Sequence, residues 1–261
     1  QEGPLAQAAG HSLNYESLTG VVRAIGPRGG PPVPPLTVVG DFAGGGLSLA
    51  YGVVCALLEA RSSGKGQIVD AAMIDGVMSL AAPFYAMHES GMHTDSMGSN
   101  LFDGGAPFYN VYETSDGKYV SVAPIEGHFY ALLLAKLGLD ANELPDRDDP
   151  TQWAALREQF AALFLTQTRD HWCELLEGTD ACFAPVLSFT EARDHPHHLA
   201  RGTFVAGAAM PEMIPTPRMD RTPGKPGPSP AWTGADTDPV LQDGGFSADE
   251  IADLRKQGAI A

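Results

Sequence analysis

The sequence predicts an α/β protein with a larger domain and a small α+β domain. Strand-like and helical patterns alternate over the first third of the chain, and a hairpin pattern followed by three helical patterns lies beyond residue 107. With 261 residues, 44% of them hydrophobic, the chain is long enough to bury a sizeable core.

The first part of the chain contains helical patterns around glycine-rich turns. Apolar residues over 12–25 favour a short helix. Residues 42–61 are apolar on nearly every face, which is typical of a buried helix, and Asp41 lies at its N-terminus. The segment QIVDAAM at 67–73 has the pattern of a short strand that continues into a second helix ending near residue 89.

The middle of the chain has the clearest strand signal. Over 107–123, two alternating runs of β-branched and aromatic residues flank Asp116-Gly117, a pair typical of hairpin turns. Three helical patterns and a strand-like FAPVL follow, and seven prolines over 206–231 predict a linker or strap. Two pairs with capping-box spacing predict helix starts nearer the C-terminus: Ser188 with Glu191, and Ser247 with Glu250.

The composition of the chain limits the kinds of partner that it can bind. The chain has 32 acidic and 16 basic side chains, which argues against a nucleic-acid surface, because phosphate contacts need clustered Lys and Arg. Gly, Pro or a charge interrupts each apolar stretch before the roughly 20 residues of a membrane span, so we expect no membrane partner. The three cysteines have no paired metal spacing, and we expect a reducing, cytoplasmic location.

Three acidic or basic side chains are candidates for chemistry. His11 lies at the start of the first helix, where it is either a capping or surface residue or an acid–base group. Asp41 is either an ordinary N-cap or part of a ligand site, in which Gly44–Gly46 let another molecule approach backbone N–H groups that favour negative charge. Glu126 opens the helix after the hairpin, where a carboxylate also complements the helix dipole.

Two further segments have a structural and a functional interpretation. The loop 99–109 joins the two apparent domains, and its Asp-Gly-Gly is either ordinary turn chemistry or the lining of a site. The tract His195-Pro-His-His does not have a recognised ligand spacing, so we expect no metal.

Six motifs in order along the chain resemble the α-methylacyl-CoA racemases of the type III CoA-transferase (CaiB/BaiF-like) family. They are GHSLNY at 10–15, GDFAGGG at 40–46, GKGQIVDAAM at 64–73, the segment 100–126, GTDACFAPV at 178–186 and GFSADEI at 245–251. The resemblance implies an interlocked homodimer with a Rossmann-like large domain, and active sites formed between the large domain of one subunit and the small domain of the other. It also implies a longer N-terminal part that carries the opening strands and most CoA contacts, because Gln1–Pro4 matches only the end of a family motif.

The resemblance also implies a division into five segments and a set of site residues. The segments are the C-terminal part of the large CoA-binding domain (1–72), a linker helix and loop (73–106), the small domain (107–204), a proline-rich return linker (205–231) and a C-terminal segment that packs back on the large domain (232–261). The implied proton-transfer bases are His11 and Asp41, with Glu126 as the partner of the histidine. The implied substrate-binding residues are Gly10, Tyr15, Phe42, Asn100, Asp103, Gly104 and Gly105.

The implied reaction is racemisation of a 2-methylacyl-CoA. One base removes the proton next to the thioester carbonyl, the other returns a proton to the opposite face, and backbone N–H groups at the start of the 42–61 helix stabilise the enolate. We expect no cofactor, because coenzyme A is part of the substrate. Two alternatives remain open: a CoA-transferase in which Asp41 carries the acyl group covalently, and a dimerising homologue without catalytic activity.

Overall fold

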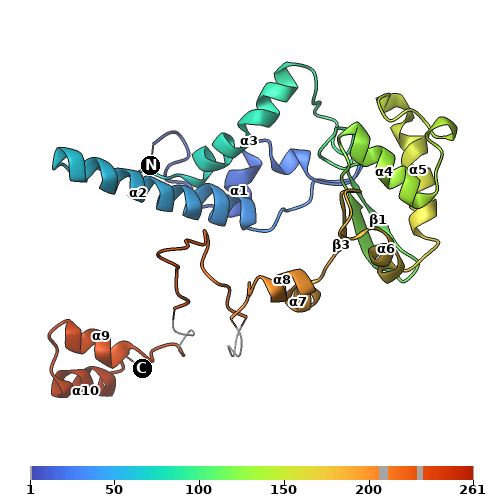
Figure 1. Cartoon of the computed structure of the whole chain (residues 1–261). Helices are drawn as coiled ribbons and strands as arrows, with labels where there is room; N and C mark the ends of the chain where they lie inside the picture. Colours follow the sequence, from blue (N-terminus) through green and yellow to red (C-terminus); the bar gives the residue numbers. More distant parts are fainter. Residues whose placement is uncertain (1, 206–210, 228–231, 261) are drawn as a thin grey trace. The chain divides into compact units, whose positions relative to one another are not determined.

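The computed structural model describes residues 2–205, 211–227 and 232–260 (Figure 1). The chain divides into two compact units, Gln1–Val186 and Leu187–Ala261. The described residues are mixed α and β, with one three-stranded antiparallel sheet. The five-segment division, the Rossmann-like character of the large domain and the interlocked dimer stay predictions.

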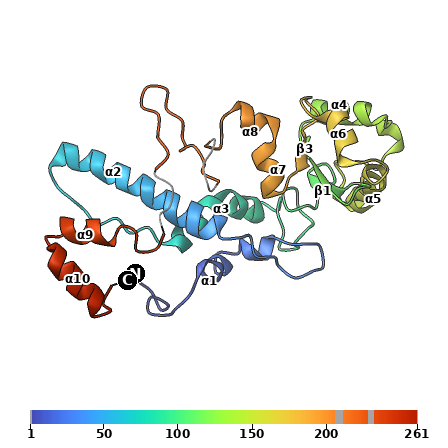
Figure 2. The same ribbon diagram turned by 90° about the horizontal axis from the view of Figure 1, so that it is seen from below.

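The first part of unit one is helical. A π-helix, η2, leads directly into α2 and contacts α3. Figures 1 and 2 show α3 lying against the N-terminal end of α2. The expected strand at 67–73 was wrong, because these residues form no strand and the helix begins at Met73. The elements are α1 (Ser12–Ser17), η1 (Val22–Ala24), η2 (Val38–Leu47), α2 (Ser48–Ser63) and α3 (Met73–Glu89).

Glycines allow η2 and α3 to approach at backbone distance. A Cβ atom at Gly76 of α3 would lie 1.9 Å from the carbonyl oxygen of Gly44, and a Cβ at Gly44 would lie 2.7 Å from Cγ2 of Val77. A Cβ at Gly45 would lie 2.8 Å from Cγ of Met73. Gly44 and Gly45 therefore serve helix packing, and the expectation that they open the backbone to a ligand was wrong for these two positions.

The expectation of a buried helix over 42–61 was also wrong, because none of the residues of α2 is buried. Its large apolar side chains face solvent, with Tyr51 72%, Leu57 59% and Leu58 61% exposed. Gly40–Gly46 do not interrupt the helix. Val38–Ser63 is 26 residues long and contains an 18-residue window with a mean hydropathy of 1.5, so length and composition alone would let it cross a membrane. The core helix of a soluble protein passes the same test.

The second part of unit one is built on the predicted hairpin. Strands β1 (Asn110–Glu113) and β2 (Tyr119–Val122) pair antiparallel, and the turn has Gly117 at φ +70°. Strand β3 (Phe183–Val186) pairs antiparallel with β2, which gives the order β1-β2-β3. The hairpin and the strand-like FAPVL are thus confirmed.

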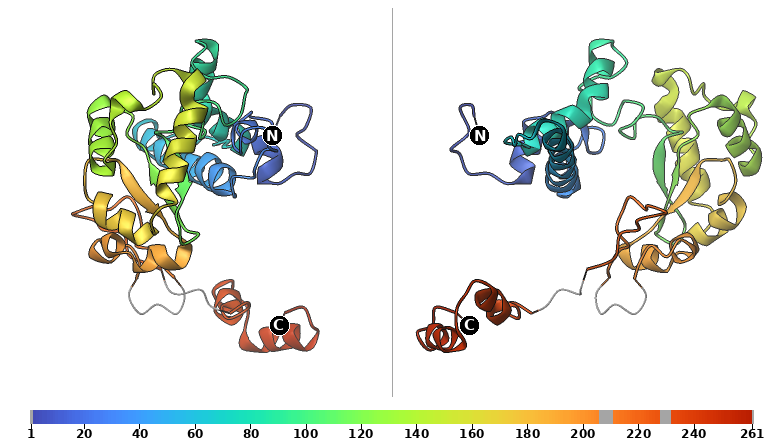
Figure 3. Two further views of the ribbon diagram at one scale, coloured as in Figure 1. Left: turned by 90° about the vertical axis from the view of Figure 1, so that its right-hand side faces the viewer. Right: turned by 60° about the vertical axis from the view of Figure 1, so that its left-hand side comes forward.

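Helices pack against this sheet and form the main core. Figure 3 shows α4 (Gly127–Leu137), α5 (Trp153–Phe164) and α6 (Arg169–Leu176) gathered beside the strands. The short 3₁₀ helices η3 (Ala141–Glu143) and η4 (Pro150–Gln152) connect α4 to α5. Fourteen buried side chains form the core: Ala106, Phe108, Tyr112, Val120, Val122, Tyr130, Leu133, Leu134, Leu156, Phe160, Phe164, Trp172, Leu176 and Ala181.

The described residues of the second unit form four short helices: α7 (Phe189–Asp194), α8 (Pro196–Ala200), α9 (Thr237–Asp243) and α10 (Ala248–Lys256). Both predicted capping boxes are confirmed, at Ser188 with Glu191 and at Ser247 with Glu250. Part of the predicted proline-rich linker, over 206–210 and 228–231, lies outside the described residues.

Candidate active site

His11 is the N-cap of α1 and is exposed. Its backbone N–H donates to Oδ1 of Asn14 at 3.0 Å. The Tyr15 hydroxyl donates to the carbonyl oxygen of Gly10 at 2.8 Å, and a Cβ at Gly10 would lie 3.2 to 3.3 Å from the Tyr15 ring. The Gly-His…Asn-Tyr motif therefore forms a closed turn that fixes the backbone on both sides of the histidine.

Asp41 lies in the first turn of η2, and its side chain is exposed. Phe42, the next residue, is 66% exposed. The backbone N–H groups of Asp41 and Phe42 donate to the Thr37 carbonyl, at 3.0 and 3.3 Å. The expectation that the start of the 42–61 helix offers its N–H groups to an enolate was therefore wrong for Phe42, since the helix itself uses that N–H.

A buried side chain that the sequence analysis missed joins α1 to η2. The Glu16 side chain is fully buried, and its Oε1 accepts from the Ser12 hydroxyl at 2.7 Å and from the backbone N–H of Gly40 at 2.8 Å. The segments that carry His11 and Asp41 are thus in contact. The four-residue spacing of Ser12 and Glu16 was a visible signal for their bond, but the bond to Gly40 had none.

Glu126 is the N-cap of α4, in the second part of unit one. Arg147, also missed by the sequence analysis, holds the segment before it, donating to the Pro124 carbonyl at 3.3 Å and the Ile125 carbonyl at 2.5 Å. Burial and the Glu126 carboxylate raise the pKa of the Cys182 thiol. Among the described residues of this one copy, no hydrogen bond or ion pair joins Glu126, at the start of α4, to His11, at the start of α1. The resemblance places this pair between two subunits, so it stays a prediction.

The four predicted binding residues of the 99–109 loop hold the loop together. Asp103 accepts from the backbone N–H groups of Gly98, Asn100 and Gly105, at 2.9, 2.8 and 3.1 Å, and from the Asn100 side chain at 2.7 Å. A Cβ at Gly105 would lie 2.3 Å from the backbone nitrogen of Asn100, and Gly104 has φ +83°. In this structure these residues therefore shape the loop.

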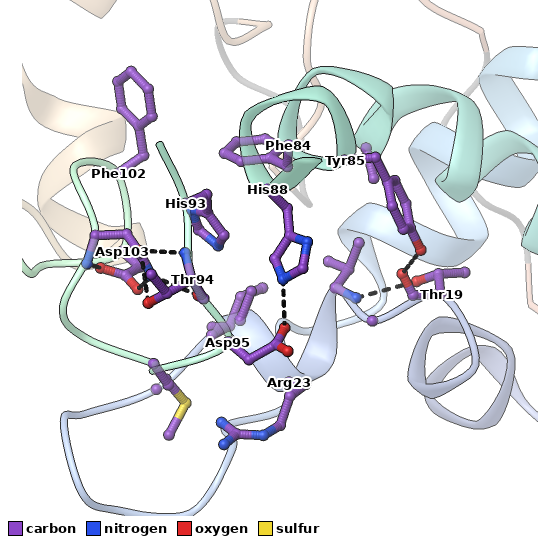
Figure 4. Close-up of a pocket in the computed structure, with 18 of the residues that line it drawn as sticks. Thr19, Arg23, Phe84, Tyr85, His88, His93, Thr94, Asp95, Phe102 and Asp103 are labelled. Atoms are coloured by element: carbon purple, nitrogen blue, oxygen red, sulfur yellow. Dashed lines mark hydrogen bonds and ion pairs between the residues drawn. The ribbon is translucent and has the colours of Figure 1, made fainter. Parts of the chain in front are cut away.

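A cavity of about 570 Å³ lies between η1, α3 and this loop (Figure 4). Asn100 and Asp103 line it, whereas His11, Asp41 and Glu126 do not. Figure 4 shows His88 pointing toward Asp95, with a distance of 3.4 Å between Nε2 and Oδ1. The walls are mainly apolar, and a cavity of this size is within the range of small-molecule sites. In the part of the chain that the structure describes, no group of three or more His, Cys, Asp or Glu side chains could hold a metal ion.

Comparison with known proteins defines the class of the chain. The family model for CoA-transferase family III matches residues 1–237, and the chain belongs to this family. It is 41% identical to mouse alpha-methylacyl-CoA racemase over 97% of this chain and 67% of the relative, and 38% identical to the human alpha-methylacyl-CoA racemase over 100% and 69%. A CAIB/BAIF family protein from Brucella suis has a similar fold, with a TM-score of 0.69, 21% identity, and coverage of 92% of this chain and 65% of that one.

Proposed function

We propose that the chain catalyses racemisation of 2-methylacyl-CoA thioesters by proton transfer through an enolate. The observation that carries the proposal is the placement of His11 and Asp41 on two segments that the buried Glu16 side chain joins. The identity of 38 to 41% to two racemases supports the same reaction class. Since the chain spans about two thirds of those relatives, the activity is a proposal for the chain as it stands.

His11 and Asp41 act as a pair of bases on opposite faces of the α carbon. An imidazole titrates near neutrality and can remove a proton in one direction and return it in the other, which contributes about 10²- to 10⁴-fold. The carboxylate performs the same two steps from the other face. No resident cofactor is required, because the thioester of coenzyme A supplies the acidifying carbonyl.

Glu126 orients the imidazole and stabilises its protonated form when a second copy of the chain brings its small domain to His11. A homodimer fits the placement of His11 at the start of α1 and of Glu126 at the start of α4, in different parts of unit one. We further propose that Gly10, Tyr15 and Phe42 contact the substrate beside the two bases. Asn100, Asp103, Gly104 and Gly105 contact the substrate from the loop that they shape.

The test is deuterium incorporation. Each epimer of a 2-methylacyl-CoA is incubated with the protein in D₂O, and we expect deuterium at the α carbon together with inversion. The variants His11→Ala and Asp41→Asn should lose inversion by about 10²-fold or more, whereas His197→Ala, at an exposed histidine of α8, should not change it.

Two other outcomes would favour the alternatives. Retention of the α proton, with a hydroxylamine-trappable acyl anhydride or CoA thioester on Asp41, would indicate the transferase. Absence of exchange, together with an unchanged melting temperature at millimolar CoA, would indicate a homologue without catalytic activity.

A further inference from the structure

The Glu16 carboxylate is fully buried, and only one of its two oxygens is hydrogen-bonded among the described residues. Oε1 accepts two hydrogen bonds, and Oε2 has no partner among the described residues. A buried carboxylate destabilises a fold unless its bonds compensate for the lost hydration. An apolar side chain would fill the same space without that cost, so packing alone does not account for Glu16.

Both donors to Oε1 are next to a proposed base. Ser12, which donates at 2.7 Å, follows His11 directly, and Gly40, which donates at 2.8 Å, precedes Asp41 directly. Oε1 of Glu16 therefore bonds both to the residue that follows His11 and to the residue that precedes Asp41. The fit is tight, because a Cβ at Gly40 would lie 2.2 Å from Oγ of Ser12 and 2.3 Å from Oε1 of Glu16.

The backbone of α1 is also anchored independently of this carboxylate. The Thr19 hydroxyl donates to the Glu16 carbonyl at 2.6 Å, and the Tyr85 hydroxyl of α3 donates to the Thr19 carbonyl at 2.7 Å. These bonds do not involve the Glu16 side chain. Replacing that side chain should therefore loosen the link to η2 while α1 stays attached to α3.

We propose that Glu16 is a positioning residue that sets the spacing between His11 and Asp41. The inference rests on the proposed racemisation and adds a residue that does not touch substrate. Inversion needs both bases aligned on one carbon, and a displacement of about 1 Å can lower the rate by about 10²-fold. Exchange with retention of configuration needs only one base, so it is less sensitive to the spacing.

The experiment compares inversion with exchange in two variants. Glu16→Gln keeps an oxygen that accepts from Ser12 and Gly40, so inversion should stay within about 5-fold of wild type. Glu16→Leu leaves the Gly40 N–H without an acceptor, and inversion should fall by about 10²-fold while exchange with retention falls by less than about 10-fold. Thr114→Val, at a buried threonine of the small domain, is the control for lost stability.

The outcomes separate this inference from the proposed function. An equal fall of inversion and exchange in Glu16→Leu, or a profile like that of Thr114→Val, would overturn the positioning role. If the wild-type chain shows no exchange at all, the proposed function fails, and hydrogen exchange at the Gly40 amide then decides whether Glu16 links the segments. If the Gly40 amide is protected from hydrogen exchange in wild type and in Glu16→Gln but not in Glu16→Leu, the Glu16 side chain links α1 to η2. A Gly40 amide that is unprotected in wild type would overturn this link.

Discussion

Replacing Gly76 with alanine should push η2, and with it Asp41, away from α3. The new Cβ would lie 1.9 Å from the Gly44 carbonyl oxygen, whereas real contacts essentially never fall below 3.0 Å, so the two backbones must separate by about 1 Å. Because the obstacle is backbone, rotation of a side chain cannot relieve it. Overpacking of this kind costs up to about 3 kcal/mol.

The net effect on stability is smaller, because alanine is favoured over glycine within a helix by about 1 kcal/mol. The remaining destabilisation of about 2 kcal/mol corresponds to a fall in melting temperature of about 4 to 8 °C for a chain of this size. Because inversion needs His11 and Asp41 aligned on one carbon, the shift of about 1 Å should also lower inversion by about 10²-fold.

Calorimetry and the inversion assay on Gly76→Ala and Gly66→Ala test this reasoning. A Cβ at Gly66 would meet no atom within 4 Å, so Gly66→Ala should match wild type in both measurements. A melting temperature of Gly76→Ala equal to or above that of wild type would refute the close approach of η2 and α3.

Three further predictions follow from the loop, the core and the segment before Glu126. Asp103→Ala removes the acceptor of four hydrogen bonds and should destabilise the chain by about 2 to 4 kcal/mol, with faster amide hydrogen exchange over 94–105. Burial raises the pKa of Tyr112, so the stability tied to its neutral form is complete below pH about 10 and is lost as the pH rises further. In denaturant unfolding, Tyr112→Phe should not show this alkaline loss of stability. An identical alkaline fall in both proteins would contradict the role of Tyr112. Arg147→Met removes the donors to the Pro124 and Ile125 carbonyls, and it should lower the rate of inversion by more than its fall in melting temperature accounts for. An unchanged rate of inversion would show that Arg147 does not support the active site.

The sequence predicted those elements whose determinants are local. Asp116-Gly117 sets the hairpin because the turn itself requires φ above zero at the glycine. The capping boxes at Ser188 and Ser247 involve side chains only three residues apart, so their spacing is sufficient. The strand at 67–73 failed because a short apolar run does not distinguish a strand from a loop that leads into a helix.

The exposure of α2 could not be predicted, since the burial of a helix depends on which other segments pack against it. An apolar helix with no polar face is expected to be buried, yet within this chain its side chains face solvent. The glycines of η2 were interpreted as an opening for a ligand, although Gly44 and Gly45 meet α3. Local sequence shows that a glycine allows a close approach but does not show what approaches.

The candidate site was predicted in part. The motifs locate His11 and Asp41, and the structure brings α1 and η2 into contact. Their link through Glu16 depends on a bond to Gly40 that spans 24 residues, which no local pattern encodes. The cavity lined by His88 and Asp95 likewise depends on the path of the 93–103 loop over α3.

The stereochemistry of exchange in single-base variants tests the central claim most directly. Each epimer of a 2-methylacyl-CoA is incubated in D₂O with His11→Ala or Asp41→Asn, and deuterium and configuration are measured separately. If the two bases face opposite sides of one carbon, each variant loses inversion and keeps exchange with retention for only one epimer, and that epimer differs between the variants. Loss of exchange for the same epimer in both variants, or inversion that survives either substitution, would contradict the account.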